Sequence, residues 1–358
     1  MGRGQRSRRN PLLTARRRPA TKRLADRLLA RSRIQPAPWS VRTGADPSRY
    51  WSPSVERAVR TALASVPVIA ADNVADYFFS LPPGSDLKFP NLAPPFASFW
   101  IEARTPPHAN LDYPKSIGAL FGAVELPAYA GFASAEDEAA SAKLSREERA
   151  LQLMHNWRVS LTDDAAFRDE MLAALDQSRW LVQWSSFYEI DDTTVGPVMK
   201  ALLFVDDSGA VVKMLHSPAA LNSADQLPDD ATMQFHIRLL WPLLFSISLM
   251  HCKNVSVQTA GMSPALSKAH QKKSGRPLLR YRTLAIGPMT RVLNLQGSAG
   301  TSGLGQALHI CHSHFKDCSA RGLFGKLRGT YWWPEHVRGS AEIGTVAKTY
   351  NVTPHAGP

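Results

Sequence analysis

Charge is divided into three blocks along the chain, and this division limits how the chain can fold. The first 42 residues hold 12 Arg and 1 Lys against one acidic residue, Asp26. Residues 43–235 hold 14 basic and 26 acidic side chains, and residues 236–358 hold 15 basic and 3 acidic ones. Blocks of one sign repel themselves, so each must face solvent, an opposite block or an external polyanion. The acidic block can neutralise only one basic block, which leaves positive charge for a partner.

The first block has the composition of a disordered tail. It lacks a sustained apolar stripe until Leu24, Leu28 and Leu29, where a short basic helix is expected on contact with a surface. Prolines then mark a linker, because each removes a backbone donor and disfavours helix at the residue before it. We therefore predict a disordered Arg-rich tail and linker over residues 1–45 and a folded body from about Ser48.

The body shows the patterns of an α+β fold. Runs rich in aromatic and β-branched residues predict strands, the fourth of them a hairpin, at 96–103, 117–126, 179–190 and 198–215, with later strands at 254–258 and 282–287. Helical spacing or capping predicts helices at 54–66, 145–161, 164–178 and 231–251. This order predicts an antiparallel sheet with helices packed on one face.

The predicted organisation behind the tail is an acidic α+β region, 46–230, and a basic α+β region, 231–358, with the alternative that the two form one domain. The longest apolar run, Leu239 to Met250, is shorter than the roughly 20 residues of a membrane span and contains Pro242. It predicts a buried helix and no membrane association. Three cysteines in a chain without an export signal predict reduced thiols and a cytoplasmic protein.

Several motifs in the last third of the chain occur together. These are MHCKNV at 250–255, KSGRPLLRYRTL at 273–284, HSHFKD at 312–317, LFGKLRGTYWW at 323–333 and HVRG at 336–339. In this set the chain resembles a family of bacterial and phage-encoded proteins, over roughly its last 110 residues. The resemblance implies a shared fold, an origin in a phage or mobile element, and no particular activity. Family members usually carry Arg-Gly where this chain has His312 and Ser313, so the resemblance implies no role for His312.

The run LHICHSHFK, residues 308–316, alternates like a strand. Such a strand places His312, His314 and Lys316 on one face. Two histidines and a lysine can contact a phosphate, or supply acid, base and charge stabilisation for phosphodiester cleavage. The candidate catalytic residues are His314 and His336, assisted by Lys316 and Arg338.

Cations and aromatic residues gather in and before the same region. The candidate nucleic-acid-binding residues are Lys316, Arg321, Lys326, Arg328, Arg338, Lys272, Lys273 and Arg276. Stacking of an unpaired base on Tyr331, Trp332 or Trp333 contributes about 1 to 3 kcal/mol per base. The two tryptophans alternate, so we expect at least one to face the core.

Metal and nucleotide sites are weaker alternatives. The residues His309, Cys311, His312, His314 and Cys318 are zinc-ligand types, but their alternation sends them to opposite faces of a strand. Glu102, Glu125 and Glu189 end three predicted strands, and their convergence would hold a divalent cation. The glycine-rich loop 297–305 lacks the lysine of a phosphate-binding loop. We predict no cofactor and no metal.

The leading hypothesis is a nucleic-acid-binding protein, with DNA and RNA left open. One alternative is a metal-independent nuclease or related phosphodiester-acting enzyme. The other is a structural or interaction protein, a possible homo-oligomer in which the acidic middle of one copy docks on a basic block of another.

Overall fold

The protein is described here by a computed structural model of all 358 residues. The residues that the structure describes are 23–29, 53–81, 88–106, 114–126, 148, 165–189, 195–218, 230–259, 265, 268–269, 271–272, 279–286, 307–311, 313–323, 325–333, 336–338 and 340–345. The predicted glycine-rich loop and nearly all of the predicted helix 145–161 lie outside them. The α+β class is confirmed.

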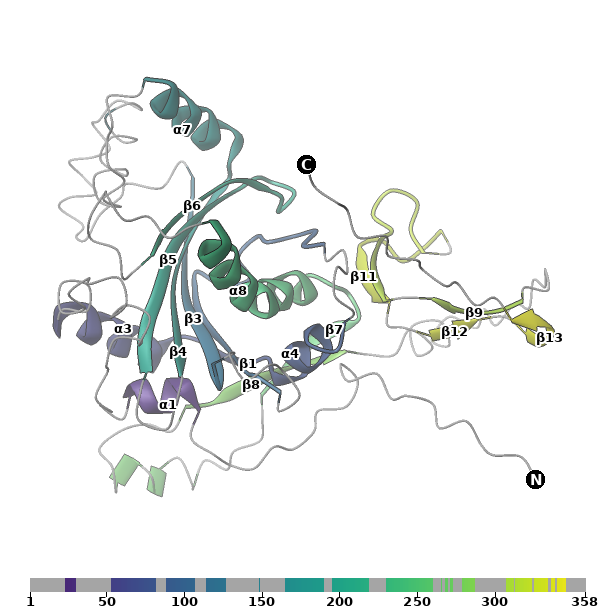
Figure 1. Cartoon of the computed structure of the whole chain (residues 1–358), viewed down its shortest axis with the longest axis horizontal. Coiled ribbons are helices and arrows are strands. Elements are labelled where there is room, and N and C mark those ends of the chain that lie inside the picture. Colours follow the sequence, from purple (N-terminus) through teal and green to yellow (C-terminus); the bar gives the residue numbers. More distant parts are fainter. Residues whose placement is uncertain are drawn as a thin grey trace.

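One eight-stranded sheet forms the centre of the fold (Figure 1). Its strands, in spatial order, are β6 (Val211–Pro218), β5 (Val195–Val205), β4 (Trp180–Glu189), β3 (Ser116–Glu125), β2 (Ser98–Arg104), β1 (Val68–Ala70), β8 (Tyr281–Ile286) and β7 (Val255–Thr259). The predicted strands are present. The sheet takes strands from both sides of residue 230, whereas the domain boundaries stay a prediction.

The sheet is mixed, whereas the prediction was an antiparallel sheet. Strand β1 runs parallel to both of its neighbours, pairing Ile69 with Ile101 of β2 and with Arg282 of β8. The helix α4 (Asp72–Phe78) lies between β1 and β2 in the chain. Parallel neighbours need such a crossover, whereas β2 to β6 follow one another as antiparallel pairs.

Helices cover both faces of the sheet, so the prediction of one covered face is also wrong. On one face, α4 and α8 (Asp230–Met250) pack against Phe99 and Ile101. On the other face, α1 (Leu24–Leu29) and α3 (Pro53–Ser65) pack around Trp100 and Val68, and α7 (Ala165–Gln177) covers Leu202 and Phe204. Successive strand residues point to opposite faces, which gives both layers a core.

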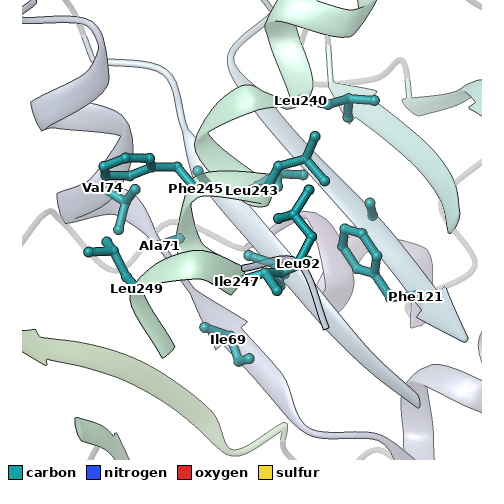
Figure 2. Close-up of a cluster of buried hydrophobic side chains, with 14 of the residues drawn as sticks. Ile69, Ala71, Val74, Leu92, Phe121, Leu240, Leu243, Phe245, Ile247 and Leu249 are labelled. Atoms are coloured by element: carbon teal, nitrogen blue, oxygen red, sulfur yellow. The ribbon is translucent and has the colours of Figure 1, made fainter. Parts of the chain in front are cut away.

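The helix α8 confirms the predicted buried helix. Figure 2 shows Leu243, Phe245 and Ile247 of this helix among residues of the sheet and of the segment around Leu92. Pro242 lies inside the helix, and the Ser246 hydroxyl donates to the Pro242 carbonyl at 2.7 Å. Because α8 is apolar on most sides, it packs against both α4 and the sheet.

The helix α1 corrects the prediction of a disordered tail. Leu24, Ala25 and Leu28 are buried in the second face of the sheet, at 1%, 0% and 1% exposure. Arg23 and Arg27 form ion pairs with carboxylates of the body. The short helix expected at Leu24, Leu28 and Leu29 is therefore present, and the burial of Leu24, Ala25 and Leu28 docks it on the body. The remainder of residues 1–45 lies outside the described ranges.

The strands after residue 306 form two small sheets beside the main one. Strand β10 (His314–Asp317) pairs with β11 (Thr330–Trp333), and β9 (Ala307–Cys311) lies between β12 (His336–Arg338) and β13 (Ser340–Thr345). The predicted single strand over LHICHSHFK is therefore two strands in different sheets. His314 and Lys316 both lie on β10, whereas His312, the third residue of the predicted face, lies outside the described residues.

Candidate functional site

The β10–β11 hairpin is fixed to the main sheet through the chain that links α8 to β7. The Asn254 side-chain amide donates to the Trp332 carbonyl at 2.7 Å and its oxygen accepts from the Trp332 N–H at 2.9 Å. The Lys253 N–H donates to the Thr330 carbonyl at 2.9 Å. Asn254 therefore replaces a neighbouring strand for β11. This gives the MHCKNV motif a structural role.

The two faces of the hairpin differ. Phe315 and Trp332 point inward, with ring centroids 4.8 Å apart, and Trp332 lies 5.2 Å from the Phe245 ring of α8. On the outer face, the Lys316 ammonium lies 4.6 Å from the centroid of the Trp333 ring, and the His314 ring is parallel to that ring with centroids 6.4 Å apart. An exposed cation–π contact contributes about 0.5 to 1 kcal/mol, enough to bias these side chains.

The loop between the two strands exposes further cations. Arg321, Lys326 and Arg328 are exposed, while Cys318, Leu323 and Tyr331 form a small core beneath them. Gly329 has φ +125°, and a Cβ there would lie 3.0 Å from the Lys253 side chain. The loop is thus a folded platform for positive charge.

Few acidic groups oppose this charge. The one carboxylate within residues 313–333 is Asp317, which accepts from the Ser319 N–H at 2.8 Å, and hydrogen bonds from Ser319 lower its pKa. In the described part of the chain, no carboxylate pairs with Lys316, Lys326 or Arg328. The described charges of this region are therefore mostly positive and exposed to solvent.

A pocket of about 680 Å³ adjoins the inner end of the hairpin. Phe245, Phe315 and Trp332 line it together with Lys88, Asn91 and polar residues of the hairpin, among them His314, Ser313 and Asp317. Tyr77 of α4 also lines it, and its hydroxyl forms a short hydrogen bond with the Ser313 hydroxyl. Sequence patterns did not indicate the pocket, because its walls come from segments far apart in the chain.

The structure does not unite the candidate catalytic residues in one strand pair. His314 and Lys316 share the outer face of β10, whereas His336 and Arg338 lie on β12, opposite Cys311 and His309 of β9. His312 lies outside the described residues. The histidine candidates therefore belong to different small sheets.

The basic residues before β8 form a separate region. Lys272 is exposed and follows the end of β7 at Thr259, whereas the hairpin contacts the residues before the start of β7. Lys273 and Arg276 lie outside the described residues. Along the chain, the hairpin therefore contacts the residues before β7, whereas Lys272 lies in the segment between β7 and β8.

The three glutamates do not converge. Glu102 is buried and accepts from the Ala25 N–H at 2.8 Å and from the Trp100 indole at 2.9 Å. Arg23 pairs with Glu102 at 3.4 Å, and Glu189 pairs with Arg27 at 3.0 Å. Burial raises the pKa of Glu102 to about 7, against the opposing effect of Arg23.

Glu125 lies at the other end of β3, exposed, where it pairs with Arg179 at 2.8 Å. Within the described ranges no group of His, Cys, Asp and Glu is arranged to hold a metal ion. Cys252 and Cys318 are free and buried, and burial raises the pKa of Cys252 to about 12.

None of the helices in the described ranges is both long and apolar enough to cross a membrane. Comparison of the chain with protein families, with curated proteins and with solved structures found no match.

Proposed function

We propose that the chain binds nucleic acid through the hairpin surface, defined as Lys253, Lys316, Arg321, Lys326, Arg328 and Trp333. The observation that carries the proposal is the set of exposed cations held on a folded loop without carboxylate partners in the described ranges. Phosphates release condensed counterions when Lys and Arg dock against them, and this release drives binding. A cationic platform that its own protein does not neutralise is suited to such a partner.

Of the three candidate aromatic residues, Trp333 alone is suited to stack on a base. Tyr331 and Trp332 are buried, at 4% and 2% exposure, whereas Trp333 is half-buried on the outer face. Lys316 lies over the Trp333 ring, so a base stacked there has a cation beside it. This arrangement favours strands with unpaired bases, and it leaves the choice of DNA or RNA to experiment.

The arginines of the first 42 residues divide into two groups. Arg23 and Arg27 are used in ion pairs with the body, so they are not part of the proposed surface. Residues 1–22 hold seven Arg and one Lys, and we propose that these add affinity without sequence preference.

The test is the salt dependence of binding to single-stranded DNA and RNA by fluorescence anisotropy, using the full chain. Lys326→Ala with Arg328→Ala should weaken binding and lower the slope of log K against log salt by about 0.7 to 0.9 for each lost phosphate contact. Arg57→Ala is the matched control, because Arg57 is an exposed cation of α3 on the other face of the main sheet. Equal slopes for the double variant and the wild type would overturn the hairpin surface, and absence of binding even at low salt would overturn the function.

A further inference from the structure

The pocket beside β10 is built by several segments that hold one another in place. The Leu92 N–H donates to the Gly209 carbonyl at 2.7 Å, and the Ser248 hydroxyl of α8 donates to the Asn91 carbonyl at 2.9 Å. Gly209 approaches so closely that a Cβ there would lie 2.0 Å from the Asn91 side-chain oxygen. The wall is therefore preformed, and its volume of about 680 Å³ is within the roughly 300 to 1,000 Å³ typical of ligand sites.

The floor of the pocket is aromatic. Phe245, Phe315 and Trp332 line it, and all three belong to or pack against the main core. The Trp332 indole N–H is buried and has no hydrogen-bond partner in the described part of the chain. A flat apolar ring is the kind of group that such a floor accommodates best.

The rim of the pocket is polar and carries a lysine and a histidine. Lys88 and His314 line it, and both are exposed. The Asn91 oxygen accepts from the Ala93 N–H at 2.9 Å, which directs the amide nitrogen away from that bond. The rim thus offers positive charge and hydrogen-bond donors above an apolar floor.

We propose that this pocket binds one nucleotide unit, with the base against the aromatic floor and the phosphate at Lys88 and His314. The inference rests on the proposed function and deepens it: the nucleotide is an unpaired or terminal one of a strand lying on the hairpin surface. His314 joins the two regions, because it lines the pocket and stacks with Trp333. A strand can therefore continue from one to the other.

Asp317 also lines the pocket, and its negative charge decides which part of the nucleotide it meets. A phosphate beside it would be repelled, whereas an amino group of a base or a hydroxyl of a ribose can donate to it. We therefore place Asp317 against the base or sugar. This makes the pocket selective for the orientation of the nucleotide.

The experiment uses the full chain with two probes, a 5′-nucleoside monophosphate and a single-stranded oligonucleotide. Lys88→Glu reverses a rim charge and should weaken both by about tenfold or more. Asn91→Asp keeps the acceptor for the Ala93 N–H but replaces the amide donor by a negative oxygen, and should weaken both as well. Arg57→Glu makes the same kind of charge change on α3, which packs on the other face of the main sheet, and should leave mononucleotide binding unchanged.

The outcomes separate the two proposals. Loss of mononucleotide binding in both pocket variants, with thermal midpoints like that of the wild type, supports the pocket. Oligonucleotide binding that is equal in the wild type and both pocket variants, together with no mononucleotide binding at millimolar concentration, overturns the pocket and leaves the hairpin surface intact. Failure of the oligonucleotide to bind the wild type overturns the proposed function. In that case the pocket proposal is kept only if the wild type binds the mononucleotide and the pocket variants do not. If Asn91→Asp lowers the thermal midpoint, Lys88→Glu decides, because its side chain is exposed.

Discussion

The two basic regions of the molecule use the same residue types in opposite ways. At α1, Arg23 just before the helix and Arg27 within it turn toward the sheet, where Asp72, Glu102 and Glu189 pair with them. On the hairpin surface, the cations turn to solvent and have no carboxylate partner in the described ranges. The first region is an internal ion-pair cluster, and the second is an exposed surface whose cations can bind an external anion.

The difference shows that the net charge of a segment does not tell whether its charged side chains pair with the protein itself or with a partner. Buried carboxylates need partners because an isolated buried charge is costly. Glu102 is 1% exposed, so the body requires a cation there. The N-terminal arginines supply it, although their composition matches that of a nucleic-acid-binding tail.

The largest expected effect comes from undocking α1. Leu24→Ala with Leu28→Ala should lower the free energy of unfolding by roughly 2 to 5 kcal/mol for each residue, unless α1 detaches first and limits the loss. Trypsin should then cut after Arg23 and Arg27 faster than in the wild type. Val211→Ala, at a residue 43% exposed, is the control. Unchanged cleavage and an unchanged urea midpoint in the double variant would show that α1 contributes nothing to the body.

The next effect concerns the ion pair beneath α1. Glu102→Ala removes a buried partner of Arg23, Ala25 and Trp100, and should cost roughly 3 kcal/mol in urea unfolding. Glu125→Ala breaks a glutamate–arginine pair that is about half exposed, and should cost less than about 1 kcal/mol. A similar decrease in the free energy of unfolding for the two variants would show that the internal and the surface pair contribute equally to stability.

A pH dependence should accompany Glu102. Its pKa in the folded chain is raised to about 7 from the ordinary 4.5, so between these values the native state binds a proton that the unfolded state has released. The contribution of Glu102 to stability is therefore full below about 4.5 and falls as the pH rises to about 7, by at most ~1.4 kcal/mol per pH unit. Glu102→Gln should flatten this slope in urea unfolding, and identical slopes would contradict it.

The smallest effect is expected on the hairpin surface itself. Lys326→Ala with Arg328→Ala should change the free energy of unfolding by less than about 0.5 kcal/mol per residue, because both side chains are exposed. Thermal unfolding measures this directly. A loss as large as that of Glu102→Ala would mean that these cations hold the fold together and are not reserved for a partner.

Much of the fold could be predicted from the sequence, because its strands and long helices are set by local patterns. Alternating aromatic residues predicted β2 to β6, and apolar density predicted α8. The unit of β1 and α4 was not recognised: three residues are too few to show a period. The docking of α1 was missed because its partners, Asp72, Glu102 and Glu189, lie far away in the chain.

The site was predicted in part for the same reason. The exposure of Lys316, Arg321, Lys326 and Arg328 follows from their local setting of glycines and polar residues. The break between β9 and β10 was not predictable, since alternation continues through it and the two strands differ only in the partners they find. No local pattern marks the pocket, whose walls meet only after folding.

The parallel placement of β1 has a consequence for biosynthesis. One edge of β1 pairs with β2, which leaves the ribosome soon after β1. The other edge pairs with β8, where Ile69 is opposite Arg282, and β8 is made much later. At 5 to 20 residues per second, that second edge stays open for on the order of ten seconds or more. The nascent chain thus carries a fully apolar strand with one unpaired edge through most of its translation, and any product truncated before Tyr281 keeps that edge as a template for aggregation.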